Sequence, residues 1–445
     1  MKAFKAYDIR GEYGVDFDKE SVYKMGFFLP QLLHVDKILV GRDIRLSSDE
    51  IFETLSQGII DAGCDVYNIG LATTPMVYYA TAKHGFEASV QITASHNPKN
   101  HNGLKISGKN AMPIGYDTGL KDLEYKVEHD KVEARAVKGK IIELQLLDEY
   151  IQFQLSYRPA FDNLNMVVDC SNGMANLLVD KIFGSRPYYI NKTMDGSFPG
   201  HEPNPLEPKN IVQLQQTVKQ QHADIGVIFD GDADRVMFVD EKGDFISPDL
   251  MIALLGHYFL EERKEYGNVL FDIRTSKSVK EYLQNMGATI NIWRVGRAYA
   301  ALKLREIDGV FGGELAGHYY FRDFFYSDSG MLASILILNI LAKFKSEGKT
   351  VSQVVAGIVK YANSGEINYV VDNKSETMEK IKNYFCEKET YTEYFDFDGY
   401  RIEFKDWWFN IRPSNTEPYL RFIAEARTQT LLQEKLQIVR QLIGQ

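Results

Sequence analysis

The feature that most constrains this fold is a repeated pattern in which a short apolar strand ends in a polar cluster, with amphipathic helices between the strands. The pattern appears at 37–43 (KILVGRD) and 88–95 (ASVQITAS), and it returns near 164–176, 223–240 and 268–287. Strands that alternate with helices are typical of α/β domains. In open α/β sheets, ligands bind where the strands end. The sequence therefore predicts several α/β units whose strand ends carry the functional residues.

The length of the chain indicates several domains. With 445 residues it is too long for a single core, at roughly 100–200 residues per domain. From about residue 366 the pattern changes to strands, a helix near 377–387 and a terminal helix, which favours a separate α+β domain. The irregular Pro-rich segment 196–210 is predicted to be an ordered surface loop.

The composition is that of a soluble globular protein, with 44% hydrophobic and 25% charged residues. A formal net charge of −10 argues against a general nucleic-acid or membrane-surface binder, because such proteins present a basic face. The N-terminal segment has no apolar signal region, and the longest apolar run, 331–342, is too short to span a bilayer. We therefore expect a cytoplasmic protein in which this run is a buried helix, with Asp328 and Ser329 as possible caps.

The stretch ITASHNP places Ser95 directly after an apolar strand and directly before His96. Adjacent residues rarely form a nucleophile and base pair, because the fold usually brings such partners together from distant positions. Ser95 therefore needs an explanation other than a Ser–His relay.

A second stretch, FDGDADR, brings three carboxylates together at the end of an apolar strand. Repulsion makes their joint ionisation costly without a cation, so Asp230, Asp232 and Asp234 indicate a divalent metal. A calcium loop is the closest rival, with Glu241 at its twelfth place, but Arg235 stands where such a loop needs Gly. Mg²⁺ beside a phosphate fits better, and a purely structural acidic turn is a further alternative.

Two other motifs carry groups that bind anions and hydroxyls. The segment 410–422 (NIRPSNTEPYLRF) concentrates guanidinium groups, hydroxyls and turn backbone, which bind phosphate by charge-assisted hydrogen bonds. It resembles no Walker loop, and an ordinary capped turn is the alternative. The segment 312–321 (GGELAGHYYF) combines a Gly pair with Glu314 and His318, although His318 on its own can also be a structural histidine.

Together the four stretches indicate phosphoryl transfer. The parts such a reaction needs are a Ser at a strand end, a carboxylate triad for Mg²⁺, a remote anion loop and a Glu/His loop, with Ser95 carrying the phosphate. A phosphoserine needs no Ser–His relay, since Mg²⁺ and cationic side chains stabilise the group in transit.

The motifs TASHNP, DGDADR, GGELAGH and RPSNTEP, in this order and spread over most of the chain, resemble those of the α-D-phosphohexomutase superfamily. The segments YDIRG, FPGHEPNPLEP and FRDFFYSDSGM bring the sequence closest to its bacterial phosphomannomutase/phosphoglucomutase branch. The resemblance implies four domains around a central cleft. Three would be related α/β mixed-sheet domains, at 1–150 with the phosphoserine loop, 151–255 with the metal loop and 256–365 with the sugar-recognition loop. The fourth would be a C-terminal α+β domain, at 366–445, with a phosphate-binding loop.

The resemblance also implies a role for each matching residue. Lys105 and His318 would be candidates for acid–base work on sugar hydroxyls, and Glu314 would bind those hydroxyls. The catalytic residues would be Ser95, His96, Lys105, Arg10, Arg235 and His318. The metal ligands would be Ser95, Asp230, Asp232 and Asp234. The substrate-binding residues would be Tyr7, Arg274, Arg297, Glu314, Ala316, His318, Arg412, Ser414, Asn415, Thr416 and Arg421.

The activity that the resemblance implies is the reversible interconversion of mannose 1-phosphate and mannose 6-phosphate, with glucose phosphates as further substrates. Phospho-Ser95 would donate to the sugar, a 1,6-bisphosphate would turn over inside the cleft, and the other phosphate would return to Ser95. Mg²⁺ would be the cofactor, and glucose or mannose 1,6-bisphosphate the activator. The chain would be an isomerase-class phosphotransferase in nucleotide-sugar biosynthesis, with sugar phosphates as partners and no nucleic acid or membrane. Exclusion of water during transfer predicts a hinge before the C-terminal domain.

Three positions depart from the family pattern. Ala316 stands where Ser is usual, Arg297 where we expect His, and Ala301 where we expect Lys. The missing hydroxyl at position 316 is worth about 1 kcal/mol, which leaves the sugar preference open. One alternative is a phosphoglucosamine mutase, which the continuation GHYYFRDF disfavours. The other is a sugar-phosphate-binding regulator with little turnover, which the intact Ser95 and aspartates disfavour.

Overall fold

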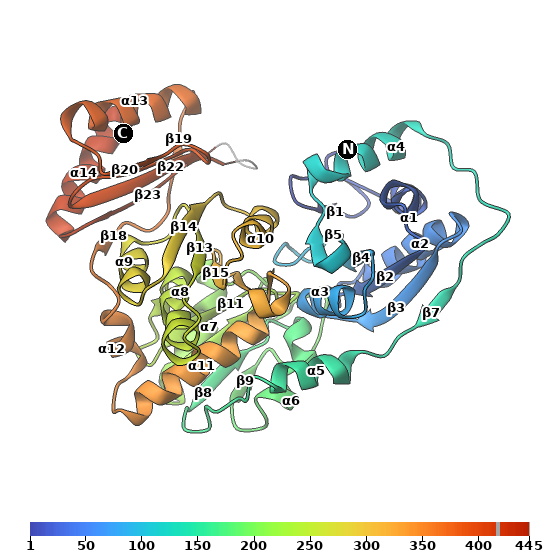
Figure 1. Cartoon of the computed structure of the whole chain (residues 1–445), viewed down its shortest axis with the longest axis horizontal. Helices are drawn as coiled ribbons and strands as arrows, with labels where there is room; N and C mark the ends of the chain where they lie inside the picture. Colours follow the sequence, from blue (N-terminus) through green and yellow to red (C-terminus); the bar gives the residue numbers. More distant parts are fainter. Residues whose placement is uncertain (415–418, 445) are drawn as a thin grey trace.

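The computed structural model describes residues 1–414 and 419–444. Its strands form four sheets that follow one another along the chain (Figure 1). Three of these sheets share a common core: three adjacent parallel strands, with the first in sequence between the other two, and an antiparallel strand beside them on one side. The shared plan makes the first three domains structurally related.

The first domain surrounds a seven-stranded mixed sheet. Its strands are β1 (Ile9–Glu12), β2 (Lys37–Arg42), β3 (Asp65–Leu71), β4 (Ala88–Ile92), β5 (His101–Gly108), β6 (Met112–Pro113) and β7 (Ile141–Glu143). The helices are α1 (Lys19–Leu33), α2 (Ser48–Asp61), α3 (Thr74–Lys83) and α4 (Leu120–His129), with 3₁₀ turns at Lys109–Ala111 and Tyr116–Thr118. The sheet order is β1-β5-β4-β2-β3-β7, in which β2, β3, β4 and β7 are parallel and β5 is antiparallel to β4.

The second domain has a five-stranded sheet in the order β12-β11-β10-β8-β9. These strands are β8 (Met166–Asp169), β9 (Tyr188–Ile190), β10 (Ile225–Phe229), β11 (Val236–Asp240) and β12 (Phe245–Ile246). The accompanying helices are α5 (Leu147–Leu155), α6 (Val179–Ile182) and α7 (Pro208–Gln220), with a 3₁₀ turn at Met174–Leu177. β8 and β10 are parallel, and β11 is antiparallel to β10.

The third domain repeats this arrangement in the order β14-β13-β15-β16-β17. Its strands are β13 (Asn268–Asp272), β14 (Thr289–Trp293), β15 (Phe311–Gly313), β16 (Tyr319–Phe321) and β17 (Ser327–Asp328). Its helices are α8 (Pro248–Gly256) with a π-helical extension (His257–Glu262), α9 (Lys277–Asn285), α10 (Arg297–Glu306), α11 (Gly330–Ser346) and α12 (Val351–Ala356), with a 3₁₀ turn at Arg322–Phe324. α8 packs against α9 and β15, and it extends across the domain boundary predicted at residue 255. The domain boundaries predicted from the sequence, after residues 150, 255 and 365, remain predictions.

The C-terminal domain has an antiparallel sheet in the order β18-β23-β22-β21-β20, and β19 also pairs with β23. The strands are β18 (Ala362–Asn363), β19 (Ile367–Val370), β20 (Glu393–Phe395), β21 (Tyr400–Glu403), β22 (Trp407–Pro413) and β23 (Tyr419–Ala426). Two helices, α13 (Lys374–Lys388) and α14 (Gln429–Ile443), pack on the sheet through Ile381, Phe385, Leu436 and other apolar residues. This is the α+β pattern expected from the sequence.

The four predicted motif loops occupy corresponding positions in the four sheets. In the first three domains, each loop joins a parallel strand to the antiparallel strand beside it: β4 to β5, β10 to β11, and β15 to β16. The fourth loop joins the antiparallel pair β22 and β23. The repeated plan therefore presents one hairpin loop from each domain as a functional segment.

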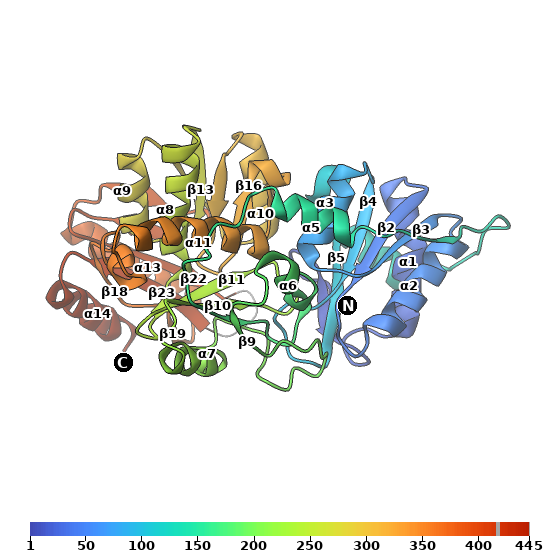
Figure 2. The ribbon, with the colours of Figure 1, turned by 90° about the horizontal axis from the view of Figure 1, so that it is seen from below.

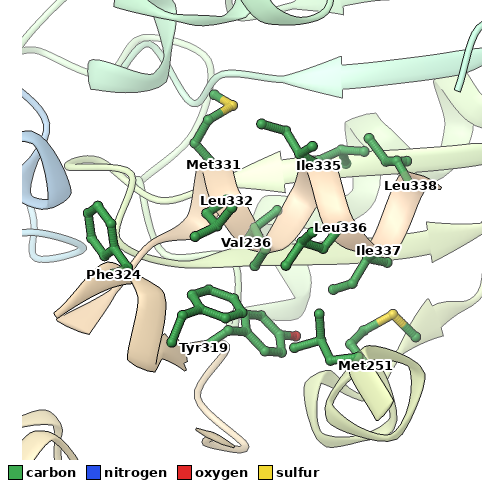
Figure 3. Close-up of a cluster of buried hydrophobic side chains, with 14 of the residues drawn as sticks. Val236, Met251, Tyr319, Phe324, Met331, Leu332, Ile335, Leu336, Ile337 and Leu338 are labelled. Carbon is green, nitrogen blue, oxygen red and sulfur yellow. The ribbon is translucent and has the colours of Figure 1, made fainter. Parts of the chain in front are cut away.

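The apolar run 331–342 forms most of α11 and is buried on all sides, as predicted. Figure 3 shows Leu332, Leu336 and Ile337 on the side of Tyr319 and Met251, while Met331, Ile335 and Leu338 point the other way. The helix contacts α8 of the third domain and β11 of the second. A helix that is apolar all round is stable only inside a core, and α11 therefore joins two domains into one hydrophobic interior.

The first and C-terminal domains lie at opposite ends of the molecule, with the second and third domains between them (Figures 1 and 2). Among residues 1–414 and 419–444, we find no helix with the length and apolar character that a membrane span requires.

Two local predictions need correction. The Pro-rich loop predicted at 196–210 ends at Glu207, because Pro208 begins α7, where a proline at the first helical position costs no hydrogen bond. Of the two possible caps of α11, only Ser329 acts as one, since its side chain accepts a hydrogen bond from Leu332 N. Asp328 faces the candidate site instead.

Candidate active site

Ser95 lies in the loop between β4 and β5 and is almost completely buried, with 1% of its surface exposed. Its backbone φ of 51° falls in the left-handed region, which is unusual for a serine and typical of functional loops. Its hydroxyl donates to Asp230 Oδ2 at 2.8 Å and lies 3.2 Å from His96 Nδ1. Burial and nearby cations, Arg235 first among them, hold the pKa of His96 well below its ordinary value. Ser95 therefore has a neutral imidazole on one side and the acidic loop of the second domain on the other.

Arg45 holds the Ser95 loop in shape, although nothing in the sequence pattern indicated this residue. Its side chain is buried, with 2% of the residue exposed, and it forms an ion pair with Asp43 at 3.2 Å. Its two terminal nitrogens donate to four backbone carbonyl oxygens at 2.7–2.9 Å, those of Ser95, Asn97, Pro98 and His101. One guanidinium group thus supplies hydrogen-bond donors to backbone carbonyl groups of a loop that lacks the regular hydrogen bonds of a β-sheet.

The acidic loop between β10 and β11 brings Asp230, Asp232 and Asp234 together in the protein interior. All three are fully buried, and a carboxylate oxygen from each lies within 4.8 Å of the others. Burial, followed by repulsion from Asp234 and Asp232, raises the pKa of Asp230 well above its ordinary value. The Oδ1 atoms of Asp232 and Asp234 have no hydrogen-bond partner within the described part of the chain. Buried carboxylates with free oxygens fit a hard divalent cation, which would take oxygen ligands here.

Lys105 of β5 reaches across to the same loop. Its Nζ donates to Asp232 Oδ2 at 2.7 Å and to Asp234 Oδ2 at 2.6 Å. Although burial disfavours every one of these charges, their mutual attraction holds the pKa of Lys105 above, and those of both aspartates below, the ordinary values. Thr74 also donates to Asp232. The acidic loop is therefore ionised where it meets the first domain.

The calcium-loop alternative is wrong, because the ligand at its twelfth place is directed elsewhere. Glu241 accepts hydrogen bonds from the backbone and hydroxyl of Ser352, at the start of α12. The flanks of the acidic loop are the strands β10 and β11, not helices.

Two hydrogen-bond partners, one at each ring nitrogen, fix the tautomer of His318. Arg235 Nε, which can only donate, lies 3.0 Å from His318 Nε2, so this nitrogen accepts. His318 Nδ1 lies 2.6 Å from Asp328 Oδ2 and therefore carries the proton of the neutral ring. Asp328 also accepts from Arg297 Nε at 2.9 Å, and although burial acts the other way, the Arg297 charge and the hydrogen bond from His318 hold the pKa of Asp328 below its ordinary range.

The positions that depart from the family pattern have different surroundings. Arg297 begins α10, and its guanidinium lies over the Tyr78 ring at 3.8 Å from the centroid. Ala316 lines the cavity described below, whereas Ala301 is buried within α10. Glu314, on the same loop as Ala316, accepts from Tyr320 and from Gly296 N, and burial raises its pKa.

A cavity of about 810 Å³ opens among the loops of the first three domains. It brings together most of the residues expected to act on the sugar and the transferring phosphate. The predicted residues on its wall are Tyr7, Arg10, Ser95, His96, Lys105, Asp234, Arg235, Arg297, Glu314, Ala316 and His318. Asp230 and Asp232 lie behind this wall, where Asp230 accepts a hydrogen bond from Ser95 and Asp232 accepts one from Lys105. Three domains thus contribute to one concave site.

The predicted phosphate-binding residues of the C-terminal domain form a second cluster. Arg412 and Arg421, together with Arg274 of the third domain, surround the carboxylate of Glu366. Ser414 lies beside them in sequence, and Lys374 Nζ donates to its carbonyl at 3.3 Å. Two of the predicted residues, Asn415 and Thr416, lie outside the described residues.

Comparisons with known proteins agree with this architecture. Four successive family models, the α/β/α domains I, II and III and the C-terminal domain of phosphoglucomutase/phosphomannomutase, match residues 1–132, 148–243, 247–361 and 366–441. The chain belongs to the phosphoglucomutase/phosphomannomutase family. The expected fold, with three related α/β domains and a C-terminal domain, is therefore confirmed.

Individual relatives within the family match over nearly their whole length. A phosphomannomutase of Vibrio cholerae is 36% identical, covering 100% of this chain and 98% of the relative. A phosphomannomutase of Escherichia coli is 34% identical over 97% of this chain and 96% of the relative. A phosphoglucomutase/phosphomannomutase family protein of Burkholderia thailandensis superposes with a TM-score of 0.89 at 26% identity, covering 99% of this chain and 97% of that structure. Membership in this family makes the chain a phosphohexomutase, an enzyme of the isomerase class.

Several residues of this family member's site escaped sequence-based prediction. Arg45, Thr74, Tyr78, Asp328 and Glu366 each contact a predicted site residue. None lies in a motif that was assigned to chemistry. They occupy different local positions, such as the interior of α3 for Tyr78 and the residue before β19 for Glu366, so they share no sequence signal that could select them.

Proposed function

We propose that this protein interconverts mannose 1-phosphate and mannose 6-phosphate, and the corresponding glucose phosphates, through phospho-Ser95 and a sugar 1,6-bisphosphate. The observation that carries the proposal is the 2.8 Å hydrogen bond from Ser95 Oγ to Asp230, at the wall of a cavity shared by three domains. It places the only serine of TASHNP between a metal-type carboxylate cluster and a space large enough for a sugar phosphate.

In the first half-reaction, a sugar hydroxyl oxygen attacks the phosphorus of phospho-Ser95. The new O–P bond forms as the bond to Ser95 Oγ breaks, and Oγ keeps the electron pair. Arg10, Lys105 and Arg235 line this part of the cavity and supply positive charge to the transferring group. In the second half-reaction, the other phosphate of the bisphosphate returns to Ser95 by the reverse chemistry. The bisphosphate must therefore turn round inside the site.

Asp230, Asp232 and Asp234, together with the Ser95 oxygen, would hold Mg²⁺. When bound, Mg²⁺ would neutralise phosphate charge as the phosphoryl group passes. Glucose 1,6-bisphosphate or mannose 1,6-bisphosphate would serve as activator, because either can phosphorylate Ser95.

His318 is the better placed of the two acid–base candidates. Its Nε2 carries no proton, since it accepts from Arg235, and Asp328 stabilises the charge that a proton on this nitrogen would create. When Arg235 turns to the transferring phosphate, Nε2 can accept the hydroxyl proton. Lys105, which donates to Asp232 and Asp234, instead serves as a fixed positive charge.

The sugar is expected to lie against Glu314, which lines the cavity together with Ala316 and Tyr7. The phosphate that is not being transferred would bind to Arg274, Arg412, Arg421 and the segment that includes Ser414, Asn415 and Thr416. The protein would act in the cytoplasm on sugar phosphates that feed nucleotide-sugar synthesis.

The decisive test is ³¹P NMR of the protein with Mg²⁺, a trace of glucose 1,6-bisphosphate, and mannose 1-phosphate or glucose 1-phosphate in parallel. Conversion of either 1-phosphate to its 6-phosphate establishes the mutase, and the ratio of rates gives the sugar preference. If both remain unchanged while glucosamine 1-phosphate is converted, the phosphoglucosamine alternative replaces the proposal. If all three remain unchanged, the sugar-phosphate-binding alternative does.

Replacing Asp232 by asparagine tests the metal site. The Asp232→Asn substitution should raise the Mg²⁺ concentration needed for half-maximal activity by at least about tenfold, because a charged oxygen ligand is lost. Calorimetric titration with Mg²⁺ alone should show the same weakening without any turnover. Asp240→Asn is the matched control, since Asp240 ends β11 and, among the residues that the structure describes, its side chain accepts hydrogen bonds only from the turn at Lys242 and Asp244. An unchanged Mg²⁺ titration of the Asp232 variant would remove this residue from the metal site.

A further inference from the structure

Three arginines from two domains surround one carboxylate at the start of the C-terminal domain. Glu366 Oε1 lies 3.3 Å from Arg421 Nη1, and Glu366 Oε2 lies 3.4 Å from Arg412 Nη2 and 3.8 Å from Arg274 Nη1. These distances exceed the value of about 2.7–2.9 Å for a close charge-assisted hydrogen bond. Glu366, whose side chain is 25% exposed, therefore balances the charge of the cluster without forming a tight pair with any one of these three arginines.

The strand register explains why these charges meet. Arg412 of β22 lies directly opposite Arg421 of β23, and Arg421 in turn lies opposite Asn368 of β19. Glu366 immediately precedes β19, and its carboxylate lies 3.4 Å from Arg412 Nη2 and 3.3 Å from Arg421 Nη1. Two like charges directly opposite one another destabilise a sheet, and a carboxylate on the same face offsets this cost. Glu366 is therefore built into the face that carries both arginines.

The third arginine already has a partner of its own. Asp272 accepts from Arg274 Nε at 3.0 Å and from Nη2 at 2.8 Å, which leaves Nη1 directed toward Glu366. The carboxylate of Glu366 thus lies within 3.3–3.8 Å of a guanidinium nitrogen from each of three arginines and lowers the positive charge that they present. A phosphate monoester near neutral pH carries close to two negative charges. The charge of Glu366 therefore opposes the binding of that dianion beside the three arginines.

We propose that Glu366 limits the affinity of this arginine cluster for the phosphate of a bound sugar. The inference rests on the proposed function, in which the bisphosphate must leave the cluster and turn round once in each catalytic cycle. Without the opposing charge of Glu366, the arginines would hold the dianion more tightly through this step and slow the turn. Glu366 is thus a charge-balancing residue, which weakens the binding of the phosphate and thereby speeds its release.

The test compares Glu366→Gln and Glu366→Asp with the wild-type protein, using mannose 6-phosphate as the probe in isothermal titration calorimetry. Loss of one negative charge beside the arginines should tighten binding of mannose 6-phosphate by about tenfold in the Gln variant. The Asp variant keeps the charge and should stay within about threefold of wild type. In steady-state assays, the Gln variant should lower both KM and kcat. Glu434→Gln is the matched control, because Glu434 is an exposed residue of the same domain.

Unchanged or weaker binding in the Gln variant would overturn the proposal, and so would equal tightening in both variants, because charge would then not be the cause. Melting temperatures within a few degrees of wild type establish that the variants fold. The binding experiment needs no turnover, so it separates this inference from the proposed reaction. If the ³¹P NMR test fails but the Gln variant still binds mannose 6-phosphate more tightly, the role of Glu366 in anion binding stands while the mutase proposal does not.

Discussion

Replacement of Ser95 by alanine should abolish mutase activity and leave the fold intact. The loss in kcat/KM should be on the order of 10⁴-fold or more, because the group that carries the phosphate is missing. The free energy of unfolding should change by only about 1 kcal/mol, since the Ser95 side chain makes one hydrogen bond to Asp230 and one to His96. The measurement is the coupled or ³¹P assay with both sugar 1-phosphates, together with thermal unfolding of the variant.

Mass spectrometry of the intact protein gives an independent readout. After incubation with glucose 1,6-bisphosphate, the wild-type chain should gain one phosphoryl group and the Ser95→Ala chain none. Ser107→Ala is a suitable control, because Ser107 is also buried in the first domain and its hydroxyl has no partner among the described residues. Turnover by the Ser95 variant at a tenth of the wild-type rate would exclude a phosphoserine mechanism.

Replacement of Arg45 by methionine should reduce both stability and activity strongly. Four backbone carbonyl groups of the Ser95 loop would lose their donor, and leaving buried polar groups unpaired should cost about 3–5 kcal/mol in the free energy of unfolding. The loop would also lose the geometry that directs Ser95 toward Asp230, so kcat should fall by about 100-fold or more. Denaturant unfolding and steady-state kinetics at a temperature below the transition measure the two effects separately.

The nearby Arg42 provides the comparison for this substitution. Arg42 pairs with Asp49 at the surface and lies over the Phe52 ring, and no hydrogen bond from it to the Ser95 loop is found in the described structure. Arg42→Met should therefore cost less than about 1 kcal/mol and leave kcat close to wild type. Equal kinetic effects of the two substitutions would show that Arg45 has no special relation to the Ser95 loop.

The location of the candidate site was predictable from sequence because many of its residues follow apolar strands. Ser95, Asp230 and Glu314 each stand one to three residues beyond a strand end, and the repeated α/β plan turns that position into a common site. The calcium alternative could also be judged early, since Arg235 replaces the glycine that such a loop requires.

The residues that support the site were not predictable, because their partners are distant in sequence. Arg45 reaches carbonyl groups about fifty residues later, and its motif gives no sign of that contact. Asp328 has the local sequence of a helix cap, yet it binds His318 and Arg297 because β17 lies beside β16 in the sheet. Glu366 looks like an ordinary linker residue until β19 pairs with β23.

The position of α11 also determines the order in which the chain can fold as it is synthesised. The strands of the second and third domains leave the ribosome before residues 330–346, yet the apolar interior that they share needs this helix. Both sheets therefore remain incompletely covered during translation, exposed to association with other nascent chains. The C-terminal domain has its own hydrophobic core, formed by residues between Tyr369 and Val439, and it can therefore fold separately after the other three domains.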